Sequence, residues 1–191
     1  MNKEPASTCF YTMTEENNGI INRVASSALV TLDLEQLYRA GERVLIDVKE
    51  QLYEGLILRE KDFRAFVKGH DWASYTGKYV AITCSAEAIV PTWAYMLLAV
   101  ALEPFAEKVV FGDLETLETI LFQEALAAID WGRYQEAKVV VKGCSRVPVP
   151  VQIYVEATSR LRAIAASIMY GEPCSTVPLF KKKIKKPEID S

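Results

Sequence analysis

Three cysteines of this chain follow apolar, strand-like runs. Cys84 directly follows the run at 79–83, Cys144 follows the run at 138–142 after one glycine, and Cys174 comes shortly after the run at 167–170. A cysteine between a strand end and a helix start lies near unpaired backbone N–H groups, which favour the thiolate over the thiol. Three thiolates at one edge of a parallel sheet predict a soft metal site for zinc, Cu(I) or an iron–sulfur cluster.

Short motifs around these cysteines repeat. The segments Cys144–Pro148 (CSRVP) and Cys174–Pro178 (CSTVP) match at four of five positions, and Cys84-Ser85 is followed at a wider spacing by another Val-Pro pair. Asp113 occupies the same place after the run at 108–111, so we predict a metal site of Cys84, Cys144, Cys174 and Asp113. Other candidates for the fourth ligand are Glu172, His70, water or a substrate.

The cysteine pattern also has less specific interpretations. Free cysteine is among the most buried residue types, and the chain contains no CxxC pair of the kind typical of thiolate metal sites. The cysteines therefore have three interpretations: a shared site, inert packing, or a role for only one or two of them. Cys9 lies near the N-terminus, outside this pattern.

The single histidine, His70, has two interpretations. It follows a predicted helix end, and Asp71 beside it could orient the imidazole for a general base or a metal ligand. The alternative is an exposed helix-end histidine that interacts with the helix dipole. The chain shows no Ser-His-Asp order, no GxSxG motif and no glycine-rich phosphate loop.

Alternating apolar runs and amphipathic stretches predict the elements that position these residues. Strands are predicted at 43–48, 79–83, 108–111, 138–142 and 167–170, with an edge strand at 29–33, and helices at 58–68, 91–106, 114–129 and 149–165. Strands separated by helices of this length pair in parallel, so we predict an α/β protein with a mainly parallel sheet and helices on both faces. Trp93, Tyr95 and Met96 are predicted to lie in its core.

Length and composition limit the possible classes of protein. The 191 residues, half of them hydrophobic, predict one α/β domain over 20–180, a loose N-terminal arm at 1–19 and a basic tail at 181–191. The net charge of −3 argues against a nucleic-acid partner, and the most apolar stretch is too short to cross a membrane. No signal-peptide pattern is visible, so we expect a cytoplasmic protein, with a homodimer as the default assembly.

Several motifs resemble an uncharacterised bacterial family, domain of unknown function 2480. The resemblance runs from about Ile20 to Phe180. Its most specific segments are Cys84-Ser85, Lys142-Gly143-Cys144-Ser145 and Gly171–Pro178, and further segments lie at 55–63, 70–72 and 90–96. It implies no activity. It does imply gene neighbourhoods for iron–sulfur cluster assembly, and therefore iron–sulfur assembly proteins as partners.

Three functions follow as hypotheses. The first is a metal- or cluster-binding accessory protein with the three cysteines as ligands. The second is a thiol-dependent enzyme assisted by His70 or Asp113, and the third is a non-catalytic interaction module with packed cysteines. Whether the protein is an enzyme is left open.

Overall fold

The computed structural model describes residues 29–143, 146–172 and 174–183. Its strands are β1 (Leu29–Asp33), β2 (Arg43–Asp47), β3 (Tyr79–Thr83), β4 (Lys108–Phe111), β5 (Lys138–Lys142), β6 (Ser167–Glu172) and β7 (Ser175–Lys181). Its α-helices are α2 (Glu60–Gly69), α3 (Thr92–Leu102), α4 (Leu114–Ala127) and α5 (Val151–Ile164). Short 3₁₀ turns are η1 (Leu34–Leu37), η2 (Val48–Gln51), η3 (Trp72–Tyr75) and η4 (Trp131–Tyr134). The predicted arm at 1–19 lies outside the described residues.

The strands form two sheets, with the orders β2-β3-β4 and β1-β5-β6-β7. Every pairing is parallel except that of β7 with β6. The α/β class and the mainly parallel pairing are therefore confirmed, and the strands divide between two sheets. Apolar periodicity identifies a strand but leaves its pairing partner open, because that partner is distant in sequence.

The two sheets belong to two related units. The inserted unit (residues 43–113) and the outer unit (29–37 with 114–183) carry matching residues in matching elements. The matching pairs include Asp47 and Asp33, Phe63 and Phe122, Trp72 and Trp131, Tyr75 and Tyr134, Pro91 and Pro150, Tyr95 and Tyr154, and Gly112 and Gly171. The first strand of the outer unit, β1, precedes the inserted unit, and the rest of the outer unit follows it.

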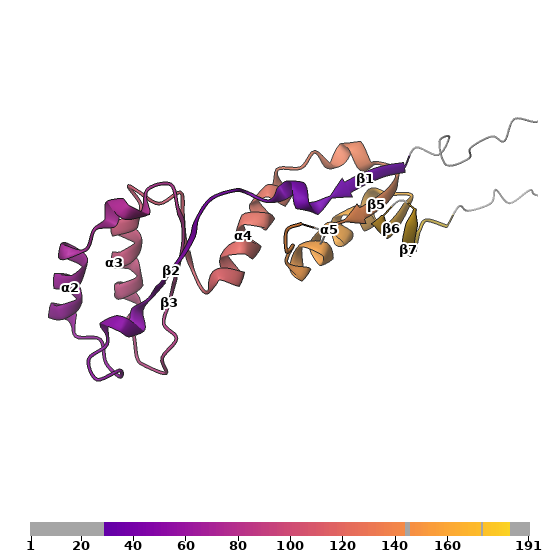
Figure 1. Cartoon of the computed structure of the whole chain (residues 1–191). Helices are drawn as coiled ribbons and strands as arrows, with labels where there is room; N and C mark the ends of the chain where they lie inside the picture. Colours follow the sequence, from indigo (N-terminus) through magenta and orange to yellow (C-terminus); the bar gives the residue numbers. More distant parts are fainter. Residues whose placement is uncertain (1–28, 144–145, 173, 184–191) are drawn as a thin grey trace, which may run out of the picture.

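Helix α4 joins the two units because it is apolar on two faces. Leu117 and Leu121 pack with Ala81 of the inserted sheet. Phe122 and Leu126, on the other face of α4, belong to the core of the outer unit. Figure 1 shows α4 in the middle of an elongated molecule, with α2 and α3 at one end and β1, β5, β6 and β7 at the other.

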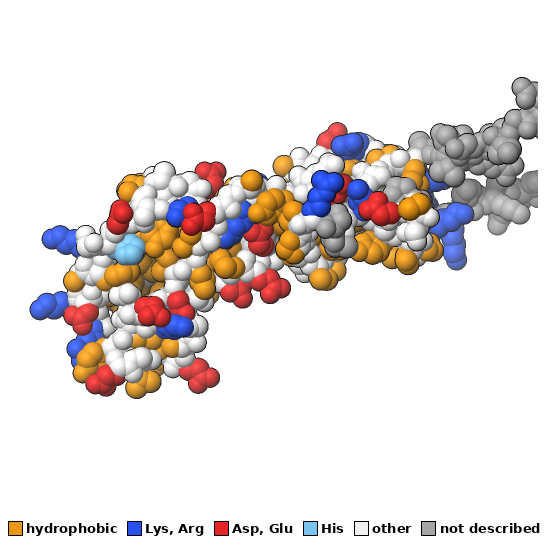
Figure 2. Space-filling view, viewed as in Figure 1, with side chains coloured by type: hydrophobic (Ala, Val, Ile, Leu, Met, Phe, Trp, Pro, Cys, Tyr) orange, Lys and Arg blue, Asp and Glu red, His pale blue; other side chains and the backbone are white. Residues whose placement is uncertain are grey.

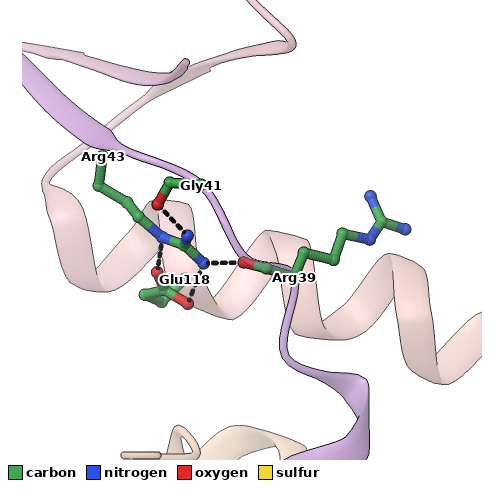
Figure 3. Close-up of polar contacts among 4 residues, drawn as sticks. All are labelled: Arg39, Gly41, Arg43 and Glu118. Atoms are coloured by element: carbon green, nitrogen blue, oxygen red, sulfur yellow. Dashed lines mark hydrogen bonds and ion pairs between the residues drawn. The ribbon is translucent and has the colours of Figure 1, made fainter. Parts of the chain in front are cut away.

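Arg43 ties the segment between the units to α4. Its guanidinium donates to both carboxylate oxygens of Glu118 and, at 2.6 Å each, to the carbonyls of Gly41 and Arg39, as Figure 3 shows. The guanidinium carbon also lies 4.6 Å from the ring centre of Tyr38. Only 12% of the Arg43 side chain is exposed, and all of these partners are close, so the guanidinium acts as a fixed clamp.

Besides shifts of one or two residues at element ends, three details differ from the sequence-based predictions. Strand β7 was not predicted. Helix α3 ends at Leu102, because Pro104 lacks the N–H that a continuing helix needs. Met96 is exposed, since α3 is apolar all round and its periodicity does not select the face that Ala94 and Leu98 bury. None of the helices in the described part of the chain combines the length and apolar content needed to cross a bilayer.

Candidate functional site

An aspartate holds the cysteine-containing turn of the inserted unit. The N–H of Ser85 donates to Oδ1 of Asp47 at 3.0 Å, and the Ser85 hydroxyl donates to Oδ2 at 2.5 Å. The N–H of Lys49 also donates to Oδ1, so Asp47 caps η2 as well. Partial burial opposes ionisation of Asp47, but the hydrogen bonds from Ser85 and Lys49 outweigh it and lower the pKa to about 2. Asp47 therefore fixes the strand end as a carboxylate that is ionised at neutral pH.

Cys84 lies beside this turn and packs inward. Its side chain is half-buried, contacts the core of the inserted unit, and has its sulfur 3.7 Å from the carbonyl oxygen of Ala86. Tyr95 lies near it. Burial raises the pKa of the Tyr95 hydroxyl, and the nearby Cys84 and Asp47 raise it further. This environment suits a packed thiol better than an exposed nucleophile.

Asp113, the predicted fourth ligand, serves as the N-cap of α4. Its Oδ1 accepts from the N–H of Thr116 at 2.8 Å and from the Thr116 hydroxyl at 2.7 Å. These hydrogen bonds lower the pKa of Asp113, and burial opposes them only weakly. One carboxylate oxygen is thus committed to the helix cap.

The carboxyl ends of the outer strands form a charged edge. Lys142 Nζ lies 3.3 Å from Asp33 and 4.0 Å from Glu172, and the N–H of Arg146 donates to Glu35 at 2.9 Å. A cavity of about 350 Å³ lies here, lined by Asp33, Glu35, Gln36, Lys142, Arg146 and Val147. Within this lining, the Lys142 ammonium pairs with the Asp33 carboxylate.

The predicted metal ligands fall in different parts of the molecule. Cys84 follows β3 of the inserted unit, whereas Cys174 is exposed between β6 and β7 of the outer unit. Cys144 lies outside the described residues. Among the described residues, no group of three or more His, Cys, Asp or Glu side chains could hold a metal ion. The three-thiolate site therefore stays a prediction.

His70 belongs to an aromatic cluster. Its Nε2 lies 3.1 Å from the Tyr75 hydroxyl, and its ring contacts Phe66, Trp72 and Tyr75 at centroid distances of 5.0, 4.5 and 5.7 Å. The imidazole is half-buried between α2 and η3. Tyr75 thus supplies the polar partner that the sequence analysis assigned to Asp71, and the contacts favour a packing role for His70.

An apolar cavity of about 460 Å³ lies beside α5 and is here called the α5 cavity. Its lining consists of Val141, Val149, Val151, Tyr154, Thr158, Tyr170 and Leu179. Tyr154 and Tyr170 meet edge to face with centroids 5.9 Å apart, and Val151 and Leu179 are exposed at the rim. The cavity therefore opens to the surface near the carboxyl ends of β5 and β6, where ligands bind in α/β sheets.

The sequence analysis missed the α5 cavity and the duplication that locates it. Asp71-Trp72 and Tyr75 reappear as Asp130-Trp131 and Tyr134, each set before a valine-containing strand and a Cys-Ser pair. An alignment of the chain with itself would have revealed this repeat. It would also have matched Tyr154 with Tyr95, and so pointed to a recurring aromatic group on the second helix of each unit.

These features define an α/β protein of two related units joined by one helix. Each unit has an aspartate at the end of its first strand and an aromatic pair beside its second helix, Tyr95 with Phe111 (centroids 5.0 Å apart) and Tyr154 with Tyr170. Residues 18–182 match the family described as "Protein of unknown function (DUF2480)", and the chain belongs to that family. Comparisons with curated proteins and with solved structures find no match.

Proposed function

We propose that this protein is a non-catalytic binding module that takes an apolar segment of a partner protein into the α5 cavity. The observation that carries the proposal is the cavity itself: about 460 Å³, apolar in its lining, and at the ligand-binding edge of a mainly parallel sheet. Its volume falls within the roughly 300–1,000 Å³ that is usual for ligand pockets.

The chemistry of the lining supports binding rather than catalysis. The polar side-chain groups that the described residues contribute to the lining are the hydroxyls of Tyr154, Thr158 and Tyr170. Among the described residues, the lining contains no carboxylate, imidazole, amine or thiol, the groups that general acid–base or nucleophilic catalysis requires. The Thr158 hydroxyl suits orientation of a bound group through a hydrogen bond.

The surroundings of the cavity favour a polypeptide over a small molecule. The exposed residues Val151 and Val155 of α5 and Val177 and Leu179 of β7 extend the apolar surface beyond the cavity. Figure 2 shows that apolar side chains remain at the surface of both ends of the molecule. Exposed apolar patches of this kind mark protein interaction sites.

Selection from a displayed library of random peptides against the full chain tests the proposal. We expect peptides with large aliphatic or aromatic side chains, with affinities measured by fluorescence anisotropy. Val151→Trp covers the cavity rim and should weaken binding at least about tenfold, a loss of about 1.4 kcal/mol. Ile89→Trp adds the same side chain at an exposed position of the inserted unit, far from the lining, and should leave the affinity within about twofold.

Two results would contradict the proposal. The first is failure to select any apolar peptide, and the second is an equal effect of the two tryptophan variants. Elemental analysis of the same protein, purified anaerobically, tests the competing zinc or iron–sulfur prediction. About one zinc per chain, or iron with sulfide, lost on Cys84→Ser and on Cys174→Ser, would favour that function and the iron–sulfur assembly partners.

A further inference from the structure

The two units differ at one strand position. In the outer unit, β7 pairs antiparallel with β6 and covers its edge. Strand β4 of the inserted unit is the equivalent of β6. Within the described residues it pairs only with β3 and forms the edge of its sheet. The registers match, because Val109 of β4 and Ile168 of β6 both lie opposite the second residue of the preceding strand in their sheet.

The open edge of β4 offers unpaired backbone groups. The N–H of Gly112 donates to the carbonyl of Ile82 on β3 at 2.9 Å. Successive residues of a strand point their N–H and C=O groups to alternate sides, so Val109 and Phe111 point theirs away from β3. A strand edge of this kind is a template for another strand.

The surface beside this edge is apolar. Phe111 is 67% exposed and meets Tyr95 of α3 edge to face, with centroids 5.0 Å apart. Met96, next to Tyr95, is 64% exposed. Helix α3 is apolar all round, and helices of that kind are normally buried on every side. Lys108, whose charge could protect the edge, is bonded to Glu124 of α4.

We propose that β4 pairs antiparallel with β4 of a second copy of this chain, which joins two inserted units through one continuous sheet. Antiparallel pairing of identical strands is self-complementary about a two-fold axis. Phe111 of each copy would then cover Val109 of the other. This surface is separate from the α5 cavity, so the proposal does not depend on the proposed function.

The sequence of β4 supports the second copy as the occupant. In the outer unit, β7 places Phe180 opposite Ile168 and Val177 opposite Tyr170. The residues of β4 equivalent to Ile168 and Tyr170 are Val109 and Phe111. In the proposed pairing, Phe111 of the second copy lies opposite Val109, and Val109 of the second copy lies opposite Phe111. Strand β4 therefore meets the same residue types, Phe and Val, that β6 meets on β7.

Sedimentation equilibrium of the full chain from about 1 to about 100 μM tests this inference, because that range covers typical weak to moderate dimers. We expect twice the chain mass of 21.4 kDa at the upper concentrations. Phe111→Glu should give a monomer. Val177→Glu, an equally exposed apolar position on β7, should leave the dimer intact.

Further variants separate the other outcomes. If Phe111→Glu fails to fold by circular dichroism, Met96→Glu on α3 replaces it, with the same expected shift to monomer. Hydrogen exchange should show slower exchange of the Val109 and Phe111 amides in the dimer than after dilution.

A full chain that stays monomeric, a dimer that survives both variants, or a dimer equally lost in Val177→Glu overturns the proposal. A full chain that is monomeric while a variant lacking residues 1–28 is dimeric would assign the edge to the chain's own N-terminal segment, and this also overturns it.

Discussion

The inserted unit and the outer unit follow the same chain path, and they differ in what each shared element faces. Position 62 of α2 and position 121 of α4 are equivalent: Asp62 is exposed, whereas Leu121 is buried against the inserted sheet. The equivalent Phe63 and Phe122 are both buried in the core of their own unit. In both helices the face with the phenylalanine packs into the core of its own unit. The face with position 62 or 121 is apolar only in α4, where it packs against the other unit.

The carboxyl ends of β2 and β1 also differ in the groups that their aspartates hold. Asp47 and Asp33 both cap a 3₁₀ turn, but Asp47 holds the Ser85 turn and Asp33 pairs with Lys142. In register, Thr83 lies opposite Asp47 where Lys142 lies opposite Asp33. The duplication thus preserved an anion at each edge while the group that it holds changed.

The largest expected effect is a loss of stability when the face of α4 that packs on the inserted sheet is truncated. Leu121→Ala should lower the free energy of unfolding by about 2–5 kcal/mol, because it leaves a cavity between α4 and the inserted sheet. Asp62→Ala, at the equivalent exposed position, should change it by less than about 0.5 kcal/mol. Urea unfolding followed by circular dichroism measures both. Equal effects would contradict the view that α4 joins the units.

The Arg43 clamp should rank second. Arg43→Ala is expected to lower the free energy of unfolding by about 2–3 kcal/mol, since hydrogen bonds to charged groups contribute about 1.5–3 kcal/mol each. Arg64 and Glu60 form an exposed pair on α2, so Arg64→Ala should cost less than about 0.5 kcal/mol. Thermal unfolding of both variants checks the difference. If Arg43→Lys unfolds at the same temperature as the wild type, the planar guanidinium is not what the site requires.

The equivalent tryptophans give a smaller contrast. Trp72 Nε1 donates to the carbonyl of Val67 at 2.7 Å, whereas Trp131 Nε1 is buried without a hydrogen-bond partner among the described residues. Trp72→Phe should therefore destabilise the protein more than Trp131→Phe, by about 1 kcal/mol from the lost hydrogen bond. Urea midpoints of the two variants measure it, and the reverse order would contradict the assignment.

A further contrast is the pH dependence of stability due to Asp47. Its folded pKa of about 2 lies below the usual aspartate value, so its stabilising contribution is complete above about pH 4. That contribution is lost as the pH falls through about 2. Asp47→Asn should flatten this part of the curve of stability against pH, and Asp62→Asn should not. Unchanged curves for both variants would mean that Asp47 does not hold the Ser85 turn in solution.

Local sequence determined most of the secondary structure. The strands at 79–83, 108–111 and 138–142 were predicted with the bounds observed, because buried parallel strands are short, continuously apolar and rich in β-branched residues. The edge strand at 29–33 was also predicted. Strand β7 was missed because Pro178 and the residues around it read as a turn-rich segment, and its strand conformation depends on pairing with β6.

Only the tertiary structure decided which strands are neighbours. The sequence placed Cys84 and Cys174 after strand ends and predicted one shared edge, but the strands belong to different sheets. The physical reason is that each parallel pairing joins segments far apart in the chain, and local periodicity contains no information on that choice. The α5 cavity and the open edge of β4 arise from the same long-range choices. The sequence contains the apolar residues of the α5 cavity and of β4, but it does not show that they line a cavity or form a sheet edge.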